Sequence, residues 1–289
     1  MQNPGPVSPP RSVRHLSHSA RDQLERCAKS FFLARIARAP KRPAVWLAGG
    51  SAVHEATEHY DLMSLVGTAD RAFNVGQVWE VYFNAQLEEA RAKEPNEHKW
   101  ASSSAEPIAV WNQIGPQFVQ SYIDWRERCP WEIWTTPDGE PAIELDVSGF
   151  LPGCPVEIKA YVDRIFWDPV MKRYPIVDLK TGKRPPSNAD QFGTYSALTK
   201  VKFDLTADLG VPFMNRKGTV GKPFELAEYT PEYVGAAYGE AWEQVQRGDW
   251  TANGFPGGCF ICDVQSSCAL QNGPLAHLYD PDFPGYRPL

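Results

Sequence analysis

The sequence predicts an α/β fold of the α+β type, in which a mixed, mostly antiparallel sheet is flanked by helices. Two observations lead to this prediction. Segments with helical periodicity fill both ends of the chain, and short β-branched segments separated by Gly and Pro occupy its middle. The 289 residues have 43% apolar content, enough to bury a full core. We expect residues 1–12 to form a disordered arm and residues 13–289 to form a single domain.

The first half of the chain contains four predicted helices. The first spans residues 19–38 and has Ser19 as its N-cap. Pro40 and Pro43 follow this helix and stop it. The other three have helical periodicity and cover residues 49–67, 75–95 and 107–128.

The second half begins with short segments that have the strand signature. Four strands are predicted, over residues 132–137, 142–151, 156–167 and 174–181. Two helices follow, over residues 189–201 and 230–249. Thr230 is the expected N-cap of the last helix, with Pro231 at its first position.

The last predicted strand ends in VDLKT, which places a carboxylate close to an ammonium. The turn-rich hexapeptide DPVMKR separates the last two strands, so we expect them to form a β-hairpin. A turn at its centre puts Asp163 opposite Asp178, where like charges are destabilising unless a cation lies between them. Lys180 projects from the same face as Asp178 because side chains alternate along a strand. The pattern indicates a divalent-metal site, although a surface hairpin with a salt bridge also explains this triplet.

Four motifs follow one another along the chain. They are G-x-x-x-H ending at His54, I-K-A-Y-V-D-R with Asp163, V-D-L-K-T-G with Asp178 and Lys180, and Q-x-x-x-Y formed by Gln191 and Tyr195. Each motif is weak by itself, but the ordered set resembles the RecB-type nucleases of the PD-(D/E)XK superfamily. The resemblance extends from Ser17 to Cys268, and it implies a restriction-endonuclease-like fold with its catalytic core in residues 140–200.

The resemblance also implies a role for each motif residue. The ligands of Mg²⁺ or Mn²⁺ would be His54, Asp163, Asp178 and the backbone carbonyl of Leu179. Lys180 would help activate the water that attacks the phosphodiester, while Gln191 and Tyr195 would hold DNA or position the catalytic groups. Oxygen ligands suit both metals, which activate water and offset charge at phosphorus. Glu144 is a candidate for the same site through a bound water, in competition with Asp146 and Glu157.

The cysteines predict a second metal centre. Cys259, Cys262 and Cys268 form a C-x2-C-x5-C motif, and such tight spacing in a cytosolic protein favours metal over disulfides. In the iron–sulfur branch of these nucleases, three C-terminal cysteines and one near the N-terminus hold a [4Fe-4S] cluster. LERCAKSFFLARI resembles the N-terminal segment, which makes Cys27 the fourth ligand, although Ala28 stands where such segments often have Pro.

Zinc is the alternative occupant, because four thiolates also suit a tetrahedral Zn²⁺ site. With either metal, residues 13–45 and 250–270 would be the segments that bind it. We expect Cys129 and Cys154, which lie outside the motif, to be buried thiols.

Charge is unevenly distributed along the chain, whose net charge is −6. Residues 11–42 contain nine Lys or Arg and two acids, and residues 180–222 contain eight and three. Basic segments on an acidic body are compatible with DNA binding because screening acts over about 8–10 Å. A solvated face explains this charge equally well. The candidate DNA contacts are Arg35, Arg38, Lys41, Lys183 and Arg184.

The resemblance implies a metal-dependent exonuclease of DNA, acting on single-stranded ends in the 5′→3′ direction, like the compact CRISPR-adaptation nucleases and their phage-encoded relatives. The chain has no G-x-x-x-x-G-K-[ST] motif, so ATP-driven activity would need a partner protein of recombination or CRISPR adaptation. A DNA-end-binding module and a structure-specific endonuclease are the alternatives. The chain lacks both a membrane-length apolar run and a secretory signal, which predicts a cytoplasmic protein of a bacterial or phage-infected cell, without membrane contact.

Overall fold

A mixed sheet of seven strands forms the centre of the molecule. The computed structural model describes residues 13–101, 106–254 and 258–288, so the expected arm over residues 1–12 lies outside it. The strands are β2 (Glu132–Ile133), β3 (Ile143–Asp146), β5 (Tyr161–Trp167), β6 (Pro175–Lys180), β7 (Leu209–Met214), β8 (Thr219–Val220) and β9 (Phe224–Glu225). They lie in the order β2-β5-β6-β7-β8, with β3 also beside β5 and β9 also beside β7.

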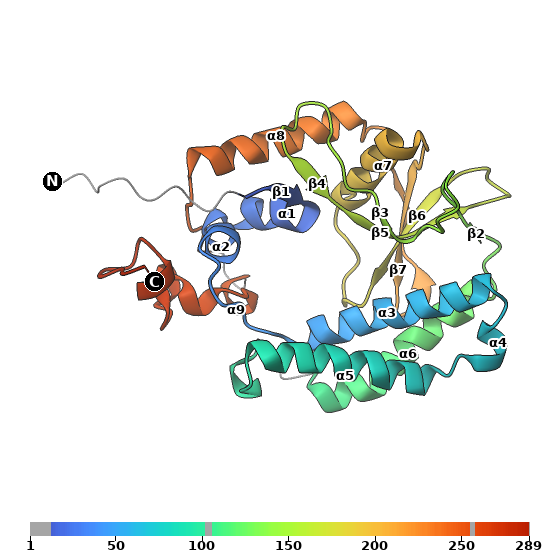
Figure 1. The fold of residues 1–289 in the computed structure, drawn as a ribbon, viewed down its shortest axis with the longest axis horizontal. Helices are drawn as coiled ribbons and strands as arrows, with labels where there is room; N and C mark the ends of the chain where they lie inside the picture. The colour runs from blue at the N-terminus through green and yellow to red at the C-terminus, as the bar shows by residue number, and fades with distance from the viewer. Residues whose placement is uncertain (1–12, 102–105, 255–257, 289) are drawn as a thin grey trace.

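Helices cover both faces of this sheet, as Figure 1 shows. The long ones are α3 (Val45–Leu65), α5 (Val75–Lys93) and α6 (Ile108–Arg126) on one face, and α7 (Asp190–Phe203) and α8 (Pro231–Arg247) on the other. The short α4 (Ala69–Ala72) and η2 (Glu97–Lys99) flank α5. Thr230 caps α8 with its side chain and Pro231 follows, as predicted. The predicted fold class is confirmed.

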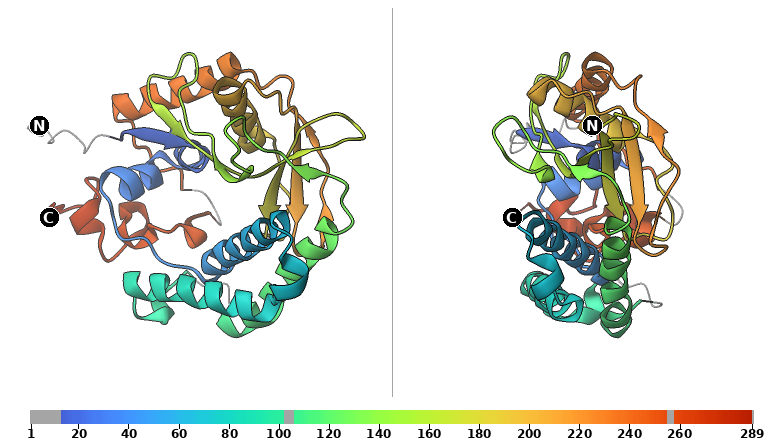
Figure 2. Two further views of the ribbon diagram at one scale, coloured as in Figure 1. Left: turned by 45° about the vertical axis from the view of Figure 1, so that its right-hand side comes forward. Right: turned by 90° about the vertical axis from the view of Figure 1, so that its right-hand side faces the viewer.

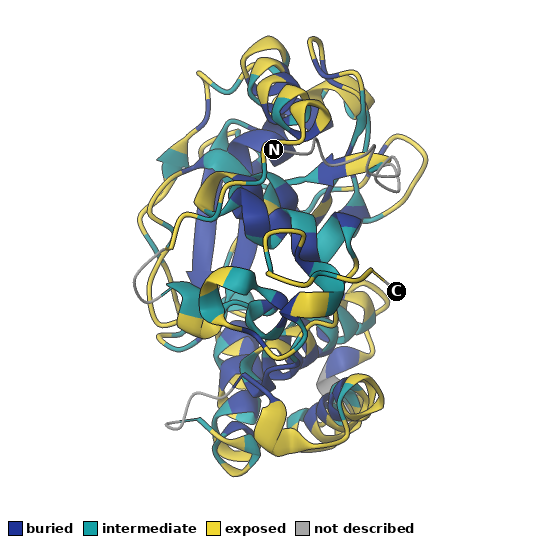
Figure 3. Ribbon diagram, turned by 90° about the vertical axis from the view of Figure 1, so that its left-hand side faces the viewer, coloured by how far each residue is buried: buried dark blue, intermediate teal, exposed yellow. Residues whose placement is uncertain are grey.

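The sheet separates two apolar cores because its side chains alternate between faces. Val177 and Leu179 pack in the core of α3, α5 and α6, whereas Ile176 packs in the core of α7 and α8. In Figure 3 the strands are largely buried, while the outer turns of the helices are exposed. No described helix is long and apolar enough to cross a membrane.

The β5–β6 hairpin has the predicted register. Arg164 pairs with Val177 and Ile165 with Ile176, so Asp163 occupies the next position, opposite Asp178. The parallel partner of β6, strand β7, was not predicted. Pro212 interrupts its pattern, because a proline inside a run argues against a central strand.

The N-terminal segment differs from its prediction. The expected helix over residues 19–38 is divided into α1 (His18–Arg26), α2 (Ala28–Phe31) and the π-helical turn η1 (Phe32–Ile36). Its N-cap is Ser17, whose Oγ accepts from the Ala20 N–H at 3.2 Å, and not Ser19. The division falls at Cys27, which has extended backbone angles.

A short two-stranded sheet ties this segment to the rest. β1 (His15–Ser17) pairs in parallel with β4 (Glu157–Lys159). The single strand predicted over residues 156–167 is therefore two strands, β4 and β5, because β4 turns away to join β1.

The first described segment of the chain, which contains α1 and α2, lies beside its C-terminal part, as Figure 2 shows. The C-terminal part consists of α9 (Gly258–Ile261), η3 (Gln265–Ser267), η4 (Ala269–Gln271) and α10 (Ala276–Tyr279). Its Asp263 carbonyl accepts from the Arg42 N–H at 2.7 Å. The buried Lys29 Nζ contacts Asp280 at 2.9 Å and Asp282 at 2.6 Å. The ends are thus joined by both backbone and side-chain contacts.

Candidate metal and catalytic site

The site begins where the β5–β6 ladder stops. Beyond the Arg164–Val177 pair, the Leu179 N–H donates to the side chain of Asp163 on β5, with Oδ2 at 2.6 Å. Asp163 and Asp178 are both buried at this point. This hydrogen bond fixes the side chain of Asp163 between the two strands.

Helix α3 brings His54 to the same place. Its Nε2 lies 3.1 Å from the Leu179 carbonyl oxygen, and its Nδ1 lies 3.5 Å from Asp163 Oδ2. Gly50, one turn earlier on α3, explains the G-x-x-x-H spacing, because a Cβ there would lie 3.3 Å from Thr181 Oγ1. The glycine lets α3 approach the end of β6 closely enough for His54 to reach the site.

Glu144 of β3 completes a compact group of possible ligands. Its Oε1 lies 3.6 Å from His54 Nδ1, and one ligand atom from each of His54, Glu144 and Asp163 falls within 4.8 Å of the others. Glu144 has a φ of +46°, a left-handed conformation that costs a non-glycine residue of order 1–3 kcal/mol. The sequence had indicated Glu144 only as a residue acting through water, but the structure places it directly in this group.

The two competitors of Glu144 have other partners. Asp146 accepts a hydrogen bond from the Ser148 N–H at 2.7 Å, and Glu157 pairs with Lys159 at 3.0 Å. The sequence could not separate Glu144 from Asp146, because both occupy alternate positions of one short strand and face the same side.

Asp178, Lys180, Gln191 and Tyr195 form a second, adjoining network. The Lys180 ammonium lies 2.6 Å from Asp178 Oδ2 and donates to Gln191 Oε1 at 2.7 Å. Gln191 Nε2 in turn donates to Asp178 Oδ1 and to the Tyr195 hydroxyl, both at 2.8 Å. The spacing of Gln191 and Tyr195 on α7 puts them on one helix face, as the motif requires.

The electrostatics of the two networks are coupled. Burial, together with the charge of Asp163, raises the pKa of Asp178 to about 6, and Lys180 opposes this rise. Burial also disfavours ionised Asp163, but His54 and the Leu179 N–H outweigh it and lower the pKa of Asp163. Burial disfavours charged His54 as well, yet Asp163 and Glu144 raise its pKa well above the usual value. A metal ion bound to His54 must displace this proton.

These residues fit a divalent cation. Asp178 Oδ2 is fully buried, and despite its short ion contact with Lys180 it accepts no hydrogen bond of good geometry among the described residues. Such an atom is expensive to bury unless a further positive charge reaches it. Three carboxylates, one imidazole and the Leu179 carbonyl supply mainly hard oxygen donors, which suit Mg²⁺ and Mn²⁺.

The four candidate cluster cysteines come together from opposite ends of the chain. Cys27, Cys259 and Cys262 line one groove, and burial raises the pKa of the Cys262 thiol to about 11, with smaller contributions from Asp263, Cys27 and Cys268. No three described cysteines have sulfur atoms that all lie within 4.8 Å of one another.

The two cysteines outside the motif differ from each other. Cys154 is buried as expected, and its thiol donates to the Val156 carbonyl at 3.2 Å. Cys129 is only half-buried, because it follows the end of α6 on the turn that leads to β2.

The candidate DNA-binding residues lie at different places in the structure. Arg35, Arg38 and Lys41 line one cavity beside η1. Arg184 lines a hollow together with Lys180, close to the catalytic network. Lys183 forms an ion pair at 3.0 Å with Glu106, a carboxylate that Arg216 also contacts at 2.8 Å.

Comparison with known proteins places this geometry in a family. Residues 15–269 match the model of the PD-(D/E)XK nuclease superfamily. The chain is 28% identical over 293 residues to the Gene 69 protein of Mycobacterium phage L5, covering 91% of this chain and 97% of that protein. It is 27% identical over 271 residues to the Gene 69 protein of Mycobacterium phage D29, with the same coverage. The chain thus belongs to the PD-(D/E)XK nuclease superfamily.

Proposed function

We propose that the protein is a metal-dependent DNA exonuclease that hydrolyses phosphodiester bonds from single-stranded ends in the 5′→3′ direction. The observation that carries this proposal is the convergence of His54, Glu144, Asp163 and the Leu179 carbonyl beside the Asp178–Lys180 pair. Carboxylates that converge with a backbone carbonyl beside a fixed ammonium suit metal-dependent phosphodiester hydrolysis, because such oxygen donors can hold the metal that activates water.

The roles of the residues follow from their contacts. When bound, Mg²⁺ or Mn²⁺ supplies a Lewis acid and lowers the pKa of a water nucleophile. Lys180 is held by Asp178 and Gln191, so its ammonium has a fixed position from which it orients that water or steadies a phosphate oxygen. Gln191 and Tyr195 act as positioning residues, since Gln191 touches both catalytic side chains and Tyr195 anchors Gln191.

We further propose that Cys27, Cys259, Cys262 and Cys268 bind a [4Fe-4S] cluster, as in the iron–sulfur branch of the RecB-type nucleases. The support for this proposal is that Cys27, Cys259 and Cys262 line one groove although they come from opposite ends of the chain. Zn²⁺ is the alternative occupant, because four thiolates also suit a tetrahedral zinc site.

The decisive experiment is digestion of end-labelled linear and circular single-stranded DNA by anaerobically purified protein with Mg²⁺, Mn²⁺ or EDTA. We expect metal-dependent loss of the linear substrate, with mononucleotides or short fragments released first from the 5′ label. Cleavage of circles would identify a structure-specific endonuclease. Binding of ends without any cleavage would identify a DNA-end-binding module that works with recombination or CRISPR-adaptation partners.

A further inference from the structure

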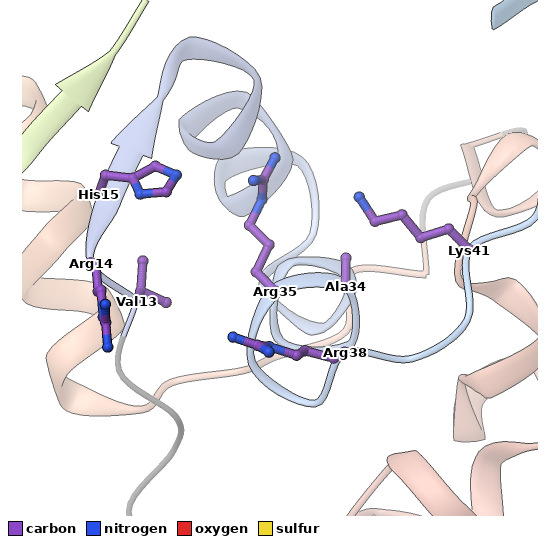
Figure 4. Close-up of a pocket in the computed structure, with 7 residues that line it drawn as sticks. All are labelled: Val13, Arg14, His15, Ala34, Arg35, Arg38 and Lys41. Atoms are coloured by element: carbon purple, nitrogen blue, oxygen red, sulfur yellow. The ribbon is translucent and has the colours of Figure 1, made fainter. Parts of the chain in front are cut away.

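A strongly basic cavity lies between η1 and the segment that leads into β1. Its volume is about 620 Å³, and Figure 4 shows the residues that line it. The lining consists of Val13, Arg14, His15, Ala34, Arg35, Arg38 and Lys41, and contains no carboxylate. We call this cavity the basic pocket. Two segments that are separated in sequence build it together, so it is a feature of the fold and not of one basic run.

The positive charge of the basic pocket is largely unbalanced. Among the described residues, no carboxylate lies within 4.0 Å of the guanidinium of Arg14, Arg35 or Arg38. Arg35 donates to the neutral Gln23 Oε1 at 3.1 Å, and burial lowers the pKa of its guanidinium. Lys41 has one partly exposed partner, Asp263 at 3.5 Å, and such pairs contribute little. The pocket therefore retains charge that an anion can neutralise.

Backbone strain at Arg38 is a second, independent observation. Its φ of +54° is left-handed, while the neighbouring Ala39 N–H bonds the Leu33 carbonyl at 2.8 Å and closes the turn. A non-glycine residue in this conformation costs of order 1–3 kcal/mol, and such strain gathers at functional sites. In Figure 4 the strained turn directs the Arg38 side chain toward Arg14, while Lys41 extends toward Arg35.

Helix α1 lines two further spaces, one beside the basic pocket and one at Lys180. A groove of about 420 Å³ shares Arg35 and Lys41 with the pocket and extends past Gln23 to Ser19. We call it the α1 groove. His18, Arg21 and Asp22 lie on another face of α1 and line the separate hollow that contains Lys180 and Gln191. Helix α1 thus lines both the hollow of Lys180 and the groove that borders the basic pocket.

The α1 groove also offers an apolar wall. Trp46 and Leu47, at the start of α3, line it together with Arg35, and the proposed cluster ligands Cys27, Cys259 and Cys262 line it as well. Single-stranded nucleic acid binds best where positive charge lies beside aromatic side chains on which bases stack. A groove with both positive charge and an apolar wall suits a single strand of nucleic acid better than it suits a small anion.

We propose that the basic pocket binds backbone phosphates of the DNA strand that is being cut, at a distance from the scissile bond set by the length of α1. This inference rests on the proposed function and adds to it a second binding point on the substrate. A strand too short to extend from Lys180 to Arg35 and Arg38 cannot reach the pocket. The pocket therefore sets a minimum substrate length.

The test measures binding of the full-length, cluster-loaded protein in EDTA, where no cleavage occurs. Fluorescence anisotropy gives the Kd for oligodeoxythymidylates of about 4 to 16 nucleotides, the usual range of single-strand site sizes. The variant is Arg35→Gln/Arg38→Gln. The control is Lys93→Gln/Arg247→Gln, which removes equal charge from exposed residues of α5 and α8 that line none of the three spaces. Unfolding curves check that each variant folds, and Arg14→Gln replaces the double variant if it does not.

We expect affinity to rise steeply above a threshold length in the wild type and the control but not in the variant, with equal affinities for the shortest strands. For long strands, the slope of log K against log salt should fall by about 0.7 for each phosphate that the variant no longer neutralises. An equal loss of affinity at every length, or an unchanged slope, would overturn the proposal.

A second arm identifies the source of the phosphate. A fluorescent nucleoside triphosphate is titrated into the same proteins. If it binds the wild type but not the variant, while the length threshold for DNA persists in both, the pocket is a nucleotide site and the strand proposal is wrong. Binding is measured in EDTA, and cleavage is measured in a separate assay. A protein that fails to cut DNA would contradict the proposed function, whereas the length dependence of binding would still test the basic pocket.

Discussion

Asp178 shows how one buried carboxylate can be required for function and unfavourable for folding. It lies opposite Asp163 in the hairpin register, and its raised pKa of about 6 reflects the cost of ionising it there. Lys180 and Gln191 compensate only part of that cost. Carboxylates with perturbed pKa values cluster at functional sites, so we attribute the position of Asp178 to its proposed chemistry and not to stability.

We therefore predict that Asp178→Asn abolishes DNA cleavage without lowering the free energy of unfolding of the metal-free protein. The amide removes a negative charge that faces Asp163 and keeps an oxygen for Gln191 or Lys180. Gel assays of cleavage and urea unfolding in EDTA measure the two effects. The matched control is Asp138→Asn, an exposed turn residue, which should retain full activity. Near-normal cleavage by Asp178→Asn would remove Asp178 from the catalytic site.

At the scale of elements, close helix packing depends on glycines that helical periodicity does not reveal. Gly115 of α6 lies against Trp79 of α5, and a Cβ at this position would come 2.1 Å from the indole ring. Gly76, in the first turn of α5, has room, since the nearest atom to its Cβ would be Asn74 Oδ1 at 3.5 Å.

We predict opposite effects for alanine at these two glycines. Gly115→Ala should destabilise the protein by about 1–3 kcal/mol or more, because the buried Trp79 must move. Gly76→Ala should be neutral or stabilise by up to about 1 kcal/mol through helix propensity. Urea unfolding measures both, and equal effects would mean that α5 and α6 do not pack as described.

The sequence predicts correctly those helices and strands whose local residue patterns agree with the tertiary structure. The DPVMKR turn and β-branched flanks fixed the hairpin register, and with it the position of Asp163 opposite Asp178. Strand β7 was not predicted because it contains Pro212. The Pro212 carbonyl accepts a hydrogen bond from the Gly221 N–H, so the side of Pro212 that lacks an N–H faces the gap between β8 and β9. No hydrogen bond of the strand ladder is lost there.

The break at Cys27 could not be predicted because the helical period continues through it. The break follows from tertiary structure, which turns α1 and α2 apart at Cys27, the residue that lines one groove with Cys259 and Cys262. Glu144 was likewise undecided from sequence, since its placement depends on a left-handed backbone that appears only in the folded chain.

At the scale of the whole molecule, Lys29 joins the two ends of the chain. It is buried, with Asp280 at 2.9 Å and Asp282 at 2.6 Å, and Asp280 also accepts from the Ala269 N–H at 2.7 Å. Ala269 directly follows Cys268, so this ion pair helps to fix Cys268, one of the proposed cluster ligands, as well as the tail.

We predict that Lys29→Met destabilises the protein by about 3–5 kcal/mol, because it leaves the Asp280 carboxylate buried without its counter-charge. Lys29→Met/Asp280→Asn should recover part of this loss, so that the two changes are far from additive. A double-mutant cycle of urea unfolding measures the coupling. Strict additivity would show that the two side chains do not interact.

The final prediction concerns Cys27, Cys259, Cys262 and Cys268, which are the proposed cluster ligands. Cys27 follows α1 and Cys259, Cys262 and Cys268 lie beyond α8, so a shared cluster joins segments more than two hundred residues apart. Closing so long a loop restricts the unfolded chain, by about 0.6 kcal/mol more for each doubling of length, and ligand binding adds further folding free energy. Anaerobically purified protein should therefore be brown, and Ser at any of the four should bleach it and promote aggregation. Cys129→Ser and Cys154→Ser are the controls, and both should keep the colour. Colourless protein with stoichiometric zinc would replace the cluster by Zn²⁺ while leaving the ligands in place.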